Sequence, residues 1–109
     1  MTRAALGEFE HQVLLALLLL GDGARSAPVV LELEARTGRS VSPAAVFIAL
    51  RRLEQRRYVR STKQPAARGE GGRGRRVFAV TEAGVARVRD SRRAFESFWQ
   101  DLDPILERR

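Results

Sequence analysis

The stretch VSPAAVFIALRRLEQRRYV, residues 41–59, joins a helix that must pack inward to a cluster of positive charge. Ser42 is a preferred helix N-cap, and Pro43 suits the first helical position, where its missing N–H costs nothing. Three apolar side chains fall at i, i+4 and i+7 and predict a core-facing side: Val46, Leu50 and Leu53. On or beside the opposite face lie Ala44, Ala45, Ile48, Ala49, Arg52 and Gln55, and the small residues among them let the helix approach another surface closely. We therefore expect one face to fold and the other to meet a negatively charged surface.

Two helices are expected before this one. The first covers residues 6–20 and ends at the glycines of 21–23. One face of it collects apolar residues at helical spacing: Phe9, Val13, Ala16, Leu17 and Leu20. Further leucines make it apolar nearly all round, which predicts burial on a second side, against another subunit. The second helix is expected over 27–37, with Ser26 as its cap, an apolar face of Val30, Leu31 and Leu33, and Gly38 at its end.

Two short strands and a long helix are expected after residue 57. The strands are YVRSTKQ at 58–64 and RRVFAVT at 75–81, joined by PAARGEGGRG at 65–74, a mobile arm carrying Arg68 and Arg73. Thr81 caps the last helix, and Asp103-Pro104 ends or kinks it. One side of this helix carries a heptad-like apolar seam of Val85, Val88, Arg92, Phe95, Trp99, Leu102 and Leu106, which Phe98 broadens. Arg92 is its one polar member.

The charge of the chain is concentrated in one quarter of its length. Residues 51–76 hold ten basic and two acidic side chains, a net charge of +8, whereas the whole chain carries +7. Such a patch is the electrostatic footprint of a nucleic-acid binder. A solubilising face is the alternative, but that usually mixes both signs.

The composition excludes several other classes of protein. The chain has no cysteine and one histidine, which excludes disulfides, cysteine-zinc sites and cysteine nucleophiles. GEGGRG at 69–74 joins two strands, not a strand to a helix, so it is not a phosphate loop. The longest apolar run, 13–20, is far shorter than the about 20 residues of a membrane span. We expect a cytoplasmic protein with no signal peptide, no membrane partner, no cofactor, no metal and no enzymatic activity.

The order of helix, helix, helix, hairpin and long helix predicts a winged helix–turn–helix, mainly α with a small β-hairpin. Residues 1–81 would form the DNA-binding domain and residues 82–109 a C-terminal dimerisation helix and tail. A helix fits the major groove of B-DNA, about 12 Å wide, and arginines beside it can bind phosphates or guanine.

Three motifs resemble the PadR-like family of transcriptional regulators, in its short form with one C-terminal helix. They are LGEFEHQVLLALLLLGDG at 6–23, VSPAAVFIALRRLEQRRYV at 41–59 and GRGRRVFAVTEAGVARV at 72–88. The resemblance implies a homodimer formed by the first and last helices, and a repressor. It also implies that Arg57 stands where the family usually has glycine, at a position that favours a left-handed backbone.

From the charges and the resemblance we expect a homodimer on a pseudo-palindromic operator in double-stranded DNA. The residues expected to bind DNA are Ser42, Ala44, Ala45, Phe47, Ile48, Arg51, Arg52, Arg56, Arg60, Arg73, Arg75 and Arg76. Ala45, Ile48 and Arg52 are those expected at the bases. The residues expected at the dimer interface are Phe9, Val13, Leu17, Val88, Phe95, Phe98, Trp99 and Leu102.

Four alternatives stay open. The basic face binds DNA or, in a winged-helix adaptor, an acidic protein partner. Trp99 either packs in the dimer seam or lines a pocket for a small aromatic effector. His11 lacks convincing partner ligands, so hydrogen bonding is expected rather than a metal. Arg92 pairs across the dimer with a residue such as Glu96, or extends to solvent.

Overall fold

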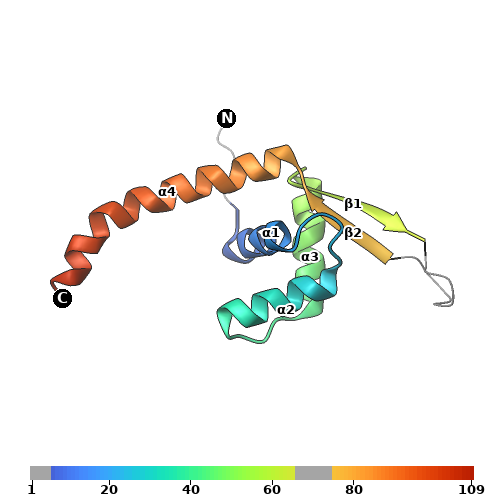
Figure 1. The fold of residues 1–109 in the computed structure, drawn as a ribbon, viewed down its shortest axis with the longest axis horizontal. Coiled ribbons are helices and arrows are strands. Elements are labelled where there is room, and N and C mark those ends of the chain that lie inside the picture. The colour runs from blue at the N-terminus through green and yellow to red at the C-terminus, as the bar shows by residue number, and fades with distance from the viewer. Residues whose placement is uncertain (1–5, 66–74) are drawn as a thin grey trace.

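A computed structural model describes residues 6–65 and 75–109 and shows a mainly α winged helix–turn–helix (Figure 1). The elements follow in the expected order: α1 (Glu8–Leu20), α2 (Ser26–Thr37), α3 (Pro43–Gln55), β1 (Val59–Gln64), β2 (Arg75–Val80) and α4 (Glu82–Glu107). In Figure 1 the two strands and α4 extend on opposite sides of the three-helix core. Within the described residues, no helix is both long and apolar enough to cross a membrane.

The core lies where α1, α2 and α3 meet the base of the strands. Its buried members include Val13, Leu14, Ala16, Leu17, Val29, Leu33, Val46, Ala49, Leu50, Leu53, Val59 and Phe78. The predicted inward face of α3 is confirmed, and Ala49, which we placed on its far side, is buried as well. Leu20 and Leu31 were predicted to face the core but are exposed, because Leu14 in α1 and Val29 in α2 occupy those places instead.

The predicted ends of α3 are confirmed in detail. The Ser42 side chain accepts a hydrogen bond from the Ala45 N–H at 3.2 Å, and Pro43 is the first helical residue. Arg57 adopts φ +65°, the left-handed conformation expected there, while its N–H donates to the Glu54 carbonyl at 2.9 Å. A left-handed residue other than glycine costs about 1 kcal/mol.

The start of α2 differs from the prediction. Ser26 is the first helical residue and not the cap; Arg25 precedes the helix and makes no side-chain capping bond. The predicted end is confirmed, because Gly38 adopts φ +70° and its N–H donates to the Glu34 carbonyl at 2.9 Å.

β1 and β2 pair antiparallel, from Val59 opposite Val80 to Gln64 opposite Arg75, and form the wing. The link between α1 and α2 joins this hairpin: the Phe78 N–H donates to the Ala24 carbonyl at 2.8 Å, and the Gly23 N–H donates to the Phe78 carbonyl at 3.1 Å. The expected arm with Arg68 and Arg73 lies outside the described residues.

α4 begins as predicted and ends later. The Thr81 side chain accepts from the Gly84 N–H at 3.1 Å and donates to the Arg57 carbonyl at 2.7 Å. Gly84 packs against the backbone of Tyr58. A Cβ at this position would lie 2.3 Å from the Tyr58 carbonyl oxygen, so only glycine fits without a shift of the backbone. The helix was expected to end or kink at Asp103-Pro104, but it continues through Pro104 to Glu107. Exposure of this last turn lets water bind the carbonyl that Pro104 leaves without an N–H partner.

Candidate nucleic-acid interface

The side of α3 that faces away from the core is exposed and carries both apolar and basic residues. Phe47 and Ile48 are 49% and 50% exposed, although burying large apolar side chains stabilises a folded protein. Ala44 and Arg51 are exposed beside them. An exposed apolar strip beside arginine is suited to a surface that offers both methyl groups and negative charge, as the major groove does.

One edge of this face meets the start of α2 and the wing around a hollow of about 440 Å³. Its lining comes from three elements and the link before α2: Arg25, Ser26, Ala27, Pro28, Leu31, Phe47, Arg75, Arg76 and Phe78. The structure thus joins the predicted Phe47, Arg75 and Arg76 to Arg25 and Leu31, which sequence reasoning missed. Two features of the sequence could have indicated that these residues are exposed. Arg25 directly precedes a helix, and Leu31 does not fall on the helix face that Val29 and Leu33 share.

A chain of hydrogen bonds joins the wing to α3. Arg76 Nη1 on β2 donates to Ser61 Oγ on β1 at 2.9 Å, and the Ser61 hydroxyl donates to the Glu54 carboxylate on α3. Arg76 therefore has a partner that orients it relative to the helix. Arg60 is exposed on β1, and Arg73 lies outside the described residues.

The other edge of α3 lies against α1 and differs from the expected phosphate-binding flank. Glu10 Oε1 lies 3.7 Å from Arg52 Nη1, and Glu10 Oε2 lies 3.7 Å from Arg56 Nη1. The Arg56 guanidinium also stacks over the Tyr58 ring, 5.3 Å from its centroid. Ser42 and Ala45 border the same edge. Two arginines expected to bind DNA are thus paired within the chain.

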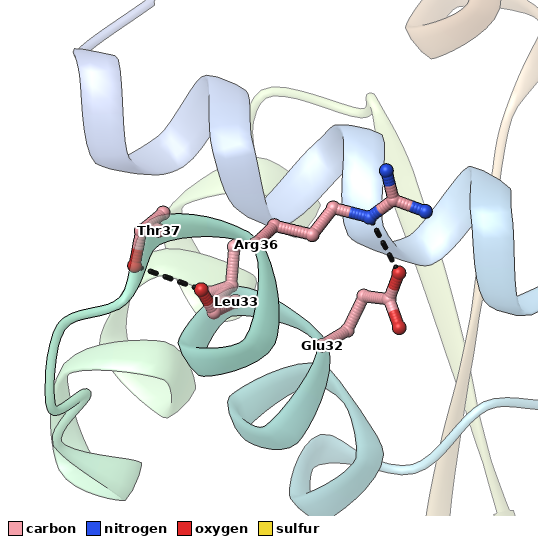
Figure 2. Close-up of polar contacts among 4 residues, drawn as sticks. All are labelled: Glu32, Leu33, Arg36 and Thr37. Atoms are coloured by element: carbon pink, nitrogen blue, oxygen red, sulfur yellow. Dashed lines mark hydrogen bonds and ion pairs between the residues drawn. The ribbon is translucent and has the colours of Figure 1, made fainter.

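The turn between α2 and α3 is fixed by polar contacts on α2. Figure 2 shows Arg36 Nε donating to Glu32 Oε1 at 2.7 Å and Thr37 Oγ1 donating to the Leu33 carbonyl at 2.8 Å. Glu34 Oε2 accepts from the Val41 N–H at 2.9 Å and thereby ties α2 to the segment that leads into α3. The exposed Arg36–Glu32 pair contributes little stability, whereas the bond to Val41 adds a polar link to the apolar packing that holds α3 in place.

α4 leaves an apolar face exposed in the single chain. Its exposed members are Phe95, Phe98, Trp99, Leu102, Ile105 and Leu106, and α1 adds Leu15, Leu18, Leu19 and Leu20. Phe9 and Val88 are partly buried against the core. Val13 and Leu17 were expected at the dimer interface, but both are buried inside the single chain, because α1 turns them toward α2 and α3. Within the single chain, Arg92 Nε lies 2.7 Å from Glu96 Oε1 of the same helix.

His11 is on α1, and its side chain packs against α4. Its ring stacks on Phe95 with 6.5 Å between centroids and 13° between planes. Burial, and then the nearby Arg87 guanidinium, lower the pKa of His11 below its ordinary 6.5. Beside it is a cavity of about 600 Å³. Among the described residues, no group of three or more His, Cys, Asp or Glu side chains is placed to hold a metal ion.

Comparison with known proteins agrees with this architecture. The sequence model of the transcriptional regulator PadR-like family matches residues 17–90, and no curated protein matches the chain. A PadR family transcription regulator from Clostridium difficile superposes with a TM-score of 0.73 at 14% identity, covering 92% of this chain and 99% of that one. One from Eggerthella lenta gives 0.70 at 21% identity, covering 89% and 82%. BpsR of Bordetella bronchiseptica, whose DNA binding is regulated by 6-hydroxynicotinic acid, gives 0.69 at 22% identity, covering 93% and 67%.

Proposed function

Because the chain belongs to the PadR-like family of transcriptional regulators, and is thus a regulator and not an enzyme, we propose that it binds a pseudo-palindromic DNA operator as a homodimer. We further propose that it acts in the cytoplasm and represses transcription. The observation that carries the proposal is the face of α3 where Phe47, Ile48 and Arg51 are exposed side by side.

In the proposed complex α3 lies in the major groove. Ala44, Phe47 and Ile48 present no hydrogen-bonding side chain, so their partners at the base edges are the methyl groups of thymine. Arg51 is long enough to bind guanine or a phosphate. Phosphates would be bound by arginines on the wing and before α2: Arg25, Arg60, Arg73, Arg75 and Arg76. Ser42, Ala45, Arg52 and Arg56 form the margin nearest α1.

The dimer is proposed from the exposed apolar face of α4 together with the exposed leucines of α1. The charges of α4 favour an antiparallel partner: residues 86–95 carry four arginines and one aspartate, whereas residues 96–107 carry four carboxylates and no basic side chain. Pairing two copies head to tail places the acidic half of each against the basic half of the other. Residues 82–109 would then be the dimerisation segment, and residues 1–81 the DNA-binding domain with two α3 helices about 34 Å apart.

A small aromatic effector is proposed for the region between α1 and α4. Trp99 is half exposed, and Phe95, one turn before it, lines the cavity beside His11. The DNA binding of BpsR is regulated by such a molecule. Interface packing alone is the competing role of Trp99. Quenching of its fluorescence by a flat aromatic acid supports the effector site, and fluorescence that ignores every such compound leaves packing as its role.

Selection from a random duplex library with the purified protein tests the proposed function. We expect recovery of an inverted repeat. If no sequence is enriched, the chain is not a sequence-specific regulator, and its basic face serves instead an acidic protein partner, as in a winged-helix adaptor.

A further inference from the structure

Glu10 places a carboxylate beside the arginines of the helix proposed to enter DNA. It lies in the first turn of α1, and its side chain is only 17% exposed. Each of its two oxygens faces a different guanidinium at 3.7 Å, that of Arg52 in α3 and that of Arg56, the residue that follows α3. The ion pairs within α2 and α4 each stay inside one helix, whereas these two join α1 to α3.

The two edges of α3 consequently differ in charge. The edge toward the wing meets Arg25, Arg75 and Arg76 around the hollow described above. Along the edge toward α1, Glu8 and Glu10 line a groove with Ala45, Ile48 and Arg52. A phosphate that approaches this second edge meets a carboxylate and two guanidinium groups whose charge is already partly neutralised.

We propose that Glu10 determines DNA specificity by holding Arg52 and Arg56 away from phosphates. This inference rests on the DNA binding proposed above and adds to it the control of how the protein docks. Non-specific complexes depend almost wholly on phosphate charge, so they tolerate many orientations. Glu10 disfavours those orientations in which the DNA backbone runs along the α1 edge of α3. It leaves the orientation in which the wing edge meets the backbone and the apolar strip meets the bases.

The distance of 3.7 Å defines a loose ion pair, longer than a charge-assisted hydrogen bond of about 2.8 Å. Arg52 is 65% exposed, so a phosphate can compete for it. The ion pairs therefore weaken phosphate binding along this edge without preventing it. Removing the charge of Glu10 makes Arg52 available for phosphate contacts that have no sequence preference, and it loosens the hold on Arg56, which still stacks on Tyr58.

The variant Glu10→Gln tests this inference, with Glu8→Gln as its matched control. Both changes remove one negative charge from the first turn of α1, but Glu8 forms no ion pair with any described residue. Affinity is measured for a random duplex and for the duplex recovered by selection, at several salt concentrations. Melting temperatures of both variants report any loss of folding.

For Glu10→Gln we expect binding of random DNA to tighten roughly five- to ten-fold at 0.1 M salt for each phosphate gained, and the salt slope to steepen by about 1 to 2. The selected duplex should gain less, so the ratio of specific to random affinity falls. Equal behaviour of Glu10→Gln and Glu8→Gln overturns the inference.

A second set of variants separates the ion pairs from the general field of the carboxylate. In an Arg52→Gln, Arg56→Gln background, adding Glu10→Gln should no longer change the affinity for random DNA. A full effect in that background contradicts the inference, because Glu10 would then act without its two partners. If the wild-type protein prefers no selected duplex, the proposed function fails, yet the random-DNA measurements still decide the role of Glu10.

Discussion

Arg76 on β2 and Ser61 on β1 are joined by a hydrogen bond of 2.9 Å from Nη1 to Oγ. The Ser61 hydroxyl in turn donates a hydrogen bond to the Glu54 carboxylate on α3. Ser61 thus links the wing to α3, the helix proposed to enter the major groove. Preorganised side chains bind with less loss of conformational freedom, so we expect this link to raise the affinity for DNA.

The variant Ser61→Ala should weaken DNA binding about three-fold, because Arg76 loses its orientation. It should also lower the free energy of unfolding by about 1 kcal/mol, because the half-buried Glu54 carboxylate loses a donor. Titration of a labelled duplex and chemical denaturation measure the two effects. Thr62→Ala, the next position on β1, is the control and points to the other side of the strand. Wild-type affinity in Ser61→Ala would show that the link does not orient Arg76 for DNA.

Replacing Arg73, Arg75 and Arg76 together by alanine should weaken binding to all duplexes alike. The salt slope should flatten by up to about 2.7, since each lost phosphate contact removes about 0.9. Affinity measured against salt concentration for selected and random duplexes tests this. The control variant Arg108→Ala, Arg109→Ala removes two positive charges from the residues that follow α4. Equal losses in both variants would mean that net charge matters and the wing does not.

Phe98→Asp should convert the proposed dimer to a monomer. Phe98 is 65% exposed on α4, and a carboxylate there would have to give up its hydration to enter the apolar seam of the dimer. Affinity for an inverted repeat should fall at least about ten-fold, because the two half-sites would no longer be bound together. Ser97→Asp adds the same charge on the opposite face of the helix and should leave the dimer intact. Sedimentation gives the oligomeric state, and a dimeric Phe98→Asp protein would contradict the proposed interface.

The lowered pKa of His11 predicts how stability depends on pH. Burial, followed by Arg87, favours the neutral imidazole in the folded chain. Glu8 and Asp90 line the same cavity but do not reverse that direction. The unfolded state therefore binds the proton more readily, and the contribution of His11 to stability is present above pH 6.5 and lost as pH falls below it.

Thermal unfolding measured between pH of about 8 and 5 tests this expectation. The melting temperature of the wild type should fall more on acidification than that of His11→Gln. Parallel pH profiles for the two proteins would show that protonation of His11 is not coupled to folding.

The helices and their caps were predictable because short-range chemistry decides them. Ser42, Thr81 and Gly38 act at the helix ends where local rules place them, and the left-handed Arg57 follows from its place after α3. The pairing of Glu10 with Arg52 was not predictable, since the two residues meet only after α1 packs across α3. Val13 and Leu17 were misplaced for a related reason: an all-apolar helix offers several possible inner faces, and only packing selects one. Leu31 and Arg25 line the candidate interface because the wing lies beside them; local patterns indicated that both are exposed but not that the wing would be their neighbour.

The central claim is sequence-specific binding by a dimer, and one titration tests it most directly. Dissociation constants are measured at one salt concentration for the selected inverted repeat, for the repeat with one half-site scrambled, and for a fully scrambled duplex. We predict that the intact repeat binds at least about 1,000-fold more tightly than the scrambled duplex, with the single half-site in between. Equal dissociation constants for all three duplexes would contradict the claim.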